Sequence, residues 1–189
     1  MTGPDPTHQL WWLTARSAGV VAFVLVTISV AIGLAMAAGL LRGPGRTKVA
    51  VALHEQLAVS GLVAMAVHGI ALVGDAFLHP GLAGVLVPFA VDYRPAFTAA
   101  GIVAADLAAA LGLSFYVRRR LGARRWRTAH RATPLVYVLG VVHTLGAGTD
   151  AGAPWLLGFV GLSLVAMPGL LAVRVVRPRL TARRRAAAR

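Results

Sequence analysis

Five long apolar runs, separated by short polar or basic stretches, dominate the hydrophobic pattern of this chain. Each run is long enough for a helix to cross a hydrocarbon core about 30 Å thick. The chain lacks the alternating pattern of barrel strands, and isolated strands cannot satisfy their backbone in lipid, so the runs predict helices. The predicted spans cover residues 17–41, 49–74, 95–117, 132–149 and 153–173.

The chain is therefore predicted to be an all-α membrane protein with one domain. Residues 1–16 form an N-terminal segment, residues 17–173 the transmembrane bundle, and residues 174–189 a basic tail. The connection from residue 75 to residue 94 is long and partly apolar between Gly81 and Phe89, which predicts a short interfacial helix. A content of 58% hydrophobic residues is too high for a soluble domain and agrees with this assignment.

Lysine and arginine are divided unevenly between the two sides that five spans define. One side carries 2 of the 19 cationic residues and the other carries 17. The positive-inside rule then predicts an N-terminus outside and a C-terminus in the cytoplasm of a multi-pass cell (plasma) membrane protein. We interpret the net charge of +13 as topology and contact with the lipid bilayer, with no nucleic acid as a partner. Tryptophans are expected in an outer belt (Trp11, Trp12, Trp155) and an inner one (Trp126).

The chain contains no cysteine. This excludes disulfides, cysteine-ligated zinc, iron–sulfur clusters and covalently attached c-type haem. A redox cofactor would have to be held by histidine or by non-covalent contacts.

Four of the six histidines lie within or beside the second and fourth spans. His54 and His68 are 14 residues apart, so they face one side of a helix at depths about 21 Å apart. His130 and His143 are 13 residues apart, a rise of about 20 Å. The two spans run in the same direction, which places His54 at the depth of His130 and His68 at the depth of His143. Two imidazoles at one depth can ligate one haem iron, so the spacing predicts two stacked b-type haems.

The fourth span poses a difficulty for this pairing. Thirteen residues on a straight helix leave His130 and His143 about 140° apart in azimuth. Pro134 offers a solution, because proline can kink a helix or make it begin late and so re-aim His130. The alternative is that all four histidines only pack between helices. His8 and His79 lie outside the spans and are expected to be solvated.

The same residues carry a family resemblance. The chain resembles the ferric reductase-like transmembrane domain of NADPH oxidases, ferric reductases and the membrane haem subunit of a bacterial methionine-sulfoxide reductase system, most closely the stand-alone actinobacterial type. The resemblance covers about residues 11–150. It is carried by WWLTARSAGVVAFVLVTISVAIGL at 11–34, LHEQLAVSGLVAMAVHGIAL at 53–72, LVPFAVDYRP at 86–95 and RRWRTAHRATPLVYVLGVVHTLGAGTD at 124–150.

The resemblance implies a bundle that passes electrons through two bis-histidine b haems. Carried over to this chain, His54 and His130 would be the axial ligands of the inner iron, and His68 and His143 those of the outer iron. Oxidases continue into a cytoplasmic flavin and nicotinamide domain, whereas no glycine-rich dinucleotide fingerprint is found here. A separate donor protein, a reduced flavin or a quinol is therefore expected to supply the electrons.

Three arginines are further candidates for cofactor binding. Arg127 and Arg131 flank His130 and suit the propionates of an inner haem, although we favour their interpretation as topology-setting cations. Arg94 is the only arginine between the second and third spans, where it could hold an outer propionate or attract an anionic acceptor.

Four acidic residues are open to two interpretations each. Glu55 could accept a hydrogen bond from a ligand imidazole or relay protons, or it could extend towards an arginine at the interface. Asp106 lies mid-span and predicts either a hydrogen-bond partner inside the bundle or part of a proton path. Asp75 and Asp150, at the outer ends of the histidine helices, are expected to cap them or to be solvated.

We therefore predict transmembrane electron transfer from a cytoplasmic or membrane donor to an acceptor on the outer side, such as ferric iron, oxygen or a partner reductase. The protein would be an oxidoreductase component that needs a separate donor, and no catalytic residue is assigned. The opposite flow of electrons, from a quinol near the membrane towards an outer partner, is also open. The alternatives are a cofactor-free membrane scaffold and a small proton-coupled transporter.

Overall fold

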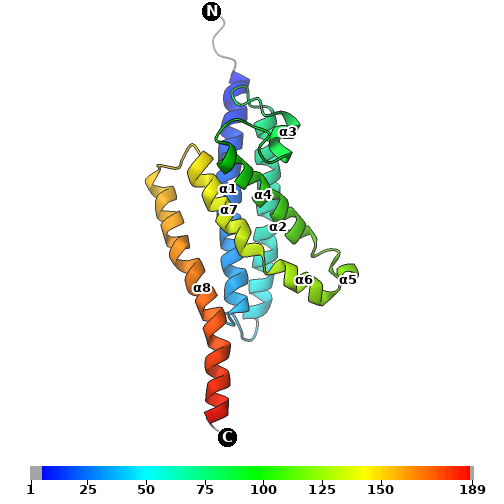
Figure 1. Cartoon of the computed structure of the whole chain (residues 1–189), viewed down its shortest axis with the longest axis vertical. Coiled ribbons are helices and arrows are strands. Elements are labelled where there is room, and N and C mark those ends of the chain that lie inside the picture. Colours follow the sequence, from blue (N-terminus) through cyan, green and yellow to red (C-terminus); the bar gives the residue numbers. More distant parts are fainter. Residues whose placement is uncertain (1–5, 188–189) are drawn as a thin grey trace, which may run out of the picture.

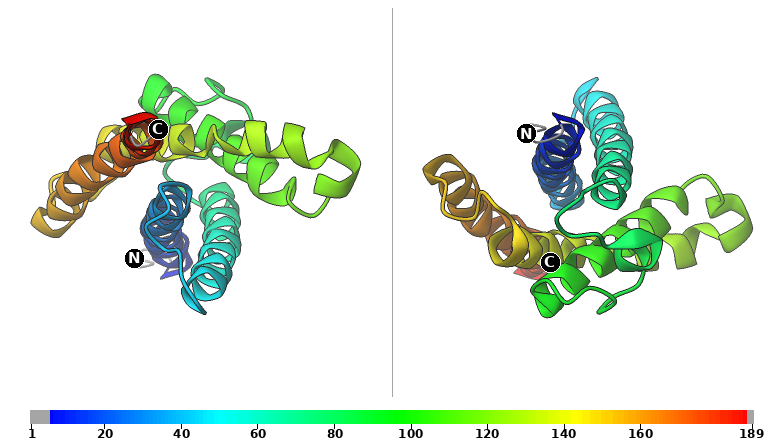
Figure 2. Two further views of the ribbon diagram at one scale, coloured as in Figure 1. Left: turned by 90° about the horizontal axis from the view of Figure 1, so that it is seen from below. Right: turned by 90° about the horizontal axis from the view of Figure 1, so that it is seen from above.

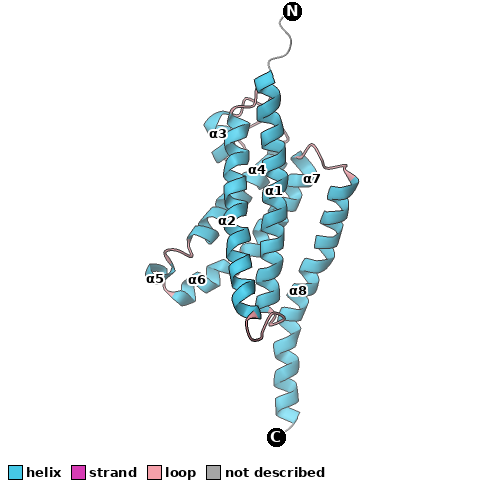
Figure 3. Ribbon diagram, turned by 180° about the vertical axis from the view of Figure 1, so that it is seen from behind, coloured by secondary structure: helices cyan, strands magenta, loops and turns pink. Residues whose placement is uncertain are grey.

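The computed structural model describes residues 6–187, and all regular elements within them are helices (Figure 3). This confirms the predicted all-α class. In chain order the helices are α1 (Pro6–Ala37), α2 (Arg46–Val73), α3 (Gly81–Leu86), α4 (Pro95–Leu113), α5 (Arg118–Leu121), α6 (Ala123–His130), α7 (Thr133–Ala147) and α8 (Pro154–Ala187).

Four of these helices are long and apolar enough to cross a membrane. They are α1 over Gln9–Ala37, α2, α4, and α8 over Pro154–Arg177. The predicted fourth span corresponds to α7, which has 15 residues and a length of about 22 Å. This helix is shorter than the predicted span over residues 132–149. A turn at residues 131–132 precedes it, and it ends before Gly148.

Two other predicted boundaries differ from the structure. The first helix begins at Pro6, ahead of the apolar run that starts at Ser17. The last helix continues to Ala187, through most of the segment predicted as a basic tail. Arginine and alanine are strong helix formers, so the end of an apolar run does not end the helix.

The helices pack in two antiparallel pairs, α1 with α2 and α4 with α7, and α8 packs against α1 on one flank (Figures 1 and 2). The N-terminal part of α1, α3 and the α7–α8 connection lie at one end of the bundle, while the α1–α2 turn and the end of α8 lie at the other (Figure 1). The connections predicted to be poor in cations thus share one end. α3 falls within the segment predicted to form a short helix.

A buried cluster joins α1, α7 and α8. Within it the Tyr137 hydroxyl lies 2.7 Å from Oγ of Ser163, and the Ser163 hydroxyl donates a hydrogen bond to the Val160 carbonyl. This network satisfies the hydroxyls of Tyr137 and Ser163 within the apolar packing. The cluster consists of Phe23, Val30, Leu34, Tyr137, Val141, Leu156, Val160 and Met167. It fixes α7, and with it the histidine that α7 carries.

Asp75 lies directly after the end of α2. Its side chain is buried, and Oδ1 accepts hydrogen bonds from the backbone N–H groups of Phe77 at 2.9 Å and Leu78 at 2.8 Å. The carboxylate thus starts the turn that leads into α3. The prediction that Asp75 caps α2 or is solvated is wrong, because the side chain is buried and a carboxylate cannot donate to the free carbonyls at the end of a helix.

Candidate functional site

The helix that was predicted to carry both His130 and His143 is interrupted. α6 ends at His130, residues 131–132 form a turn, and α7 begins at Thr133. Pro134 has no N–H to offer the His130 carbonyl, which instead accepts a hydrogen bond from the Thr133 hydroxyl. The two histidines therefore do not share one straight helix, and the azimuthal difficulty of the 13-residue spacing disappears.

His54 of α2 and His130 of α6 form the first histidine pair. Their ring centroids are 6.1 Å apart and their planes differ by 88°. Nδ1 of His54 lies 2.8 Å from the Ser29 carbonyl oxygen and 3.0 Å from Oγ of the same residue on α1. These partners fix the orientation of the His54 ring.

His68 of α2 and His143 of α7 form the second pair. Their ring centroids are 6.4 Å apart, with 73° between the planes. Nδ1 of His68 lies 2.7 Å from the Ala15 carbonyl oxygen of α1. Nδ1 of His143 lies 3.0 Å from the Phe97 carbonyl oxygen of α4. The structure thus brings the four histidines together in the two pairs that the spacing predicted.

The geometry of both pairs fits two axial ligands on one haem iron. A metal–imidazole bond is about 2 Å long and the ring centre lies about 1 Å further, so two such ligands hold their centroids about 6 Å apart. A carbonyl can accept only from a protonated Nδ1, which leaves Nε2 free as the ligand atom in three of the four histidines. Within residues 6–187 no cluster of three or more such side chains could hold a bare ion, but haem iron needs only two protein ligands. That these pairs bind haem stays a prediction.

His130 has different surroundings from the other three. Its ring stacks on Trp126, one helical turn earlier in α6, with 5.0 Å between centroids and 24° between planes. Its Nδ1 is buried and makes no regular hydrogen bond within the described residues, while the backbone of Leu111 on α4 lies close to the ring. Trp126, which was predicted in an inner aromatic belt, lies between His130 and Phe115, whose ring centroid is 5.9 Å away.

The candidate arginines lie beside the histidine pairs. Arg94, exposed at the start of α4, donates a hydrogen bond of 2.6 Å to the Gly146 carbonyl near the end of α7. It therefore joins the two helices close to His143. Arg127 and Arg131 are exposed on either side of His130. A role of any of the three towards haem propionates stays a prediction.

The remaining polar candidates lie on the surface of the bundle. Glu55 and Asp106 are exposed on α2 and α4, which disagrees with the alternative that Asp106 is a hydrogen-bond partner inside the bundle. The interior role was one of two alternatives drawn from its mid-span position, and the sequence does not tell which face of α4 it lies on. His79 is exposed, as expected. The side chain of His8 lies outside the described residues.

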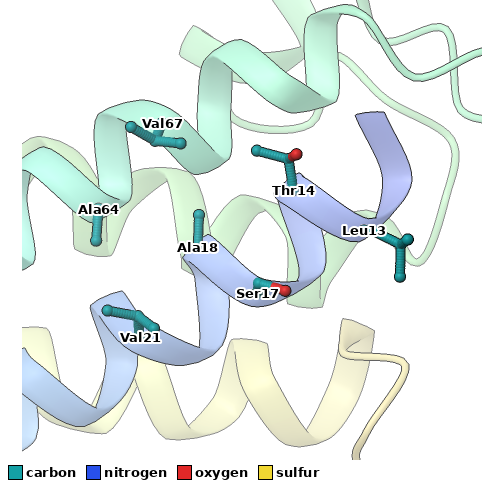
Figure 4. Close-up of a pocket in the computed structure, with 7 residues that line it drawn as sticks. All are labelled: Leu13, Thr14, Ser17, Ala18, Val21, Ala64 and Val67. Carbon is teal, nitrogen blue, oxygen red and sulfur yellow. The ribbon is translucent and has the colours of Figure 1, made fainter. Parts of the chain in front are cut away.

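A shallow groove runs along the contact between α1 and α2 (Figure 4). Its volume is about 450 Å³, and its lining is apolar apart from the hydroxyls of Thr14 and Ser17. Val67, next to His68, forms part of its wall, but the imidazole rings do not line it. The groove is therefore distinct from the place where the histidines meet.

Arg16 and Asp150 form an ion pair between α1 and the α7–α8 connection. Nε of Arg16 donates to Oδ2 at 2.7 Å, and Nη2 contacts Oδ1. The hydrogen bond from Arg16 lowers the pKa of Asp150 below its ordinary value. Asp150, predicted to cap or solvate a helix end, thus connects two helices.

We expect this pair to make a small, pH-dependent contribution to stability. Because the folded pKa of Asp150 is lowered, the contribution is complete at neutral pH and is lost progressively as the pH falls from about 4 through the lowered pKa of the folded state. The Asp150→Asn variant should therefore lower the Tm at pH 7 by a few degrees at most. Thermal unfolding in detergent at pH 7 and pH 3.5 measures this. An equal difference between variant and parent at both pH values would contradict the prediction.

The fold and the site together define a class: a multi-pass helical membrane protein with two pairs of facing histidines. The sequence matches the family of the ferric reductase like transmembrane component over residues 18–141, more than half of the chain, and the protein belongs to this family. The match includes His54, His68 and His130, and His143 follows two residues after it ends. No curated protein and no solved structure matches the chain.

Membership confirms the resemblance predicted from sequence. The family indicates transmembrane electron transfer in general, by domains that usually work with a separate electron donor.

Proposed function

We propose that this protein carries electrons across the cell membrane through two b-type haems. His54 and His130 would hold the inner haem, and His68 and His143 the outer one. The observation that carries this proposal is the double pairing, with ring centroids 6.1 and 6.4 Å apart. A pair formed by helix packing alone has no reason to repeat this spacing at two depths.

Haem bound at these pairs would supply reversible one-electron reduction of its iron. The chain's own residues would orient its ligands. The carbonyls of Ala15, Ser29 and Phe97 accept the Nδ1 protons of three histidines, which directs each Nε2 away from its supporting helix. Arg94 at one end and Arg127 and Arg131 at the other are suited to carboxylates such as haem propionates.

The distribution of cationic residues supports an orientation of the bundle in the membrane, and thereby an end at which electrons would enter. The end of the bundle that holds the α1–α2 turn carries most of the cations and is assigned to the cytoplasm. Electrons from a separate flavoprotein, a reduced flavin or a quinol would enter at the pair of His54 and His130. They would leave from the pair of His68 and His143 to ferric iron, oxygen or a partner reductase outside.

Haem content tests the proposal directly. The protein purified in detergent from haem-replete cells is expected to contain two haems per chain and to give the reduced-minus-oxidised spectrum of low-spin b-type haem. The measurements are a haem assay against protein concentration and the visible difference spectrum. A haem-free preparation would overturn the proposal and favour a scaffold or a proton-coupled transporter.

A further inference from the structure

Three of the four histidines share a local environment on the helix that supports them. Each Nδ1 is hydrogen-bonded to a backbone carbonyl, and the residue four positions after that carbonyl is a glycine. We call each such unit a carbonyl–glycine pair. The pairs are Ala15 with Gly19 facing His68, Ser29 with Gly33 facing His54, and Phe97 with Gly101 facing His143.

The spacing of four residues has a physical reason. On a helix, a side chain points back over the preceding turn, so that a residue at i+4 covers the carbonyl of residue i. That carbonyl already accepts one hydrogen bond within its own helix, and its second lone pair remains available. A donor on a neighbouring helix can reach this lone pair only if no side chain at i+4 covers it. Glycine at i+4 leaves this lone pair open to an imidazole from the next helix.

The glycines are in direct contact with the imidazole rings. A Cβ added to Gly19 would lie 2.9 Å from Nδ1 of His68, and one added to Gly33 would lie 3.1 Å from Cε1 of His54. A Cβ on Gly101 would collide with Nδ1 of His143. A side chain at Gly19 or Gly101 would therefore force the ring to move, and one at Gly33 would displace it by a few tenths of an ångström.

The arrangement on α1 repeats with the period of the histidines. Gly19 and Gly33 are 14 residues apart, as are His54 and His68, and the antiparallel packing of α1 and α2 matches the two sets in reverse order. Glycines that serve only close packing of membrane helices are common. Gly61 is such a glycine in the same interface, since its added Cβ would meet Val26 at 2.9 Å and no histidine.

We propose that Gly19, Gly33 and Gly101 are positioning residues, which open a backbone carbonyl to the Nδ1 proton of a haem ligand. This inference rests on the proposed function, because it concerns how the ligands are held. A hydrogen bond from Nδ1–H makes the imidazole a stronger donor and favours oxidised iron. The pair of His68 and His143 has two such ligands, whereas the pair of His54 and His130 has one.

Alanine variants test the inference site by site. Gly19→Ala is expected to shift the midpoint potential of the outer haem to a more positive value and to change its low-spin EPR signal, with the inner haem unchanged. Gly33→Ala should do the same to the inner haem alone. Gly61→Ala is the matched control and should leave both haems unchanged. Redox titration followed by visible and EPR spectroscopy gives these readouts.

The unaffected haem in each variant reports that the bundle is folded. Unchanged potentials and EPR signals in both Gly19→Ala and Gly33→Ala would overturn the inference, as would an equal shift in Gly61→Ala. If the variants do not fold, pulsed EPR of the oxidised parent decides: both Nδ1 protons at the outer haem should show the signature of a hydrogen bond to a carbonyl. Nδ1 protons without such a hydrogen bond at the outer haem would overturn the inference. A parent without haem would instead refute the proposed function.

Discussion

The His68→Ala variant is expected to purify with one haem per chain instead of two. His68 is the α2 member of the outer pair, and its removal leaves His143 as a single ligand, whereas the ring centroids of His54 and His130 remain 6.1 Å apart about 21 Å further along α2. Electron transfer through the membrane should then fall to the background of protein-free vesicles. Haem content and the reduction of an acceptor outside vesicles loaded with reductant measure both effects.

His79→Ala is the matched control for this variant. His79 is exposed outside the spans, and its replacement should leave two haems per chain and full electron transfer. Two haems in the His68→Ala protein would contradict the assigned pairs. One haem in the His79→Ala protein would show that the assignment of the outer ligands is wrong.

The Pro134→Ala variant is expected to lose the inner haem and keep the outer one. Alanine restores an N–H that can bond to the His130 carbonyl, so that α6 and α7 can join into one helix. On one straight axis, His130 and His143 would point about 140° apart. Since α7 is fixed by the buried cluster around Tyr137, His130 is the residue that moves.

The measurement is again haem per chain, with the visible spectrum showing which haem remains. Haem content should fall from two towards one. Pro95→Ala is the control, because Pro95 also stands in the first turn of a helix but interrupts none. Both haems retained in Pro134→Ala with unchanged spectra would show that proline does not maintain the break.

The pairing of the histidines was predictable because it depends on their separation in sequence and on the order of the spans, which can both be read from the sequence. Helical rise converts the separation of His54 and His68 into depth, and the alternation of spans gives the direction of each helix. Pro134 marked the break between α6 and α7 for a local reason, its missing N–H. The identity of the membrane-spanning segments followed from their length and apolarity.

Other features could not be predicted because they depend on the faces that helices turn towards each other. Every residue has a backbone carbonyl, so the sequence does not show which carbonyls accept hydrogen bonds from His54, His68 and His143. The 14-residue spacing of Gly19 and Gly33 was present in the sequence, but glycine in membrane helices has too many uses to single it out. The stacking of Trp126 on His130 likewise needed the geometry of α6.

The carbonyl–glycine pairs also bear on how the protein is made. The helix that provides each pair precedes, in chain order, the helix that carries the matching histidine: α1 comes before α2, and α4 before α7. A ribosome therefore delivers each of these imidazoles into lipid after its hydrogen-bond acceptor is in place, which spares the cost of an unpaired polar group there. His130 has no carbonyl–glycine pair on an earlier helix, so it would enter the inner centre without this support.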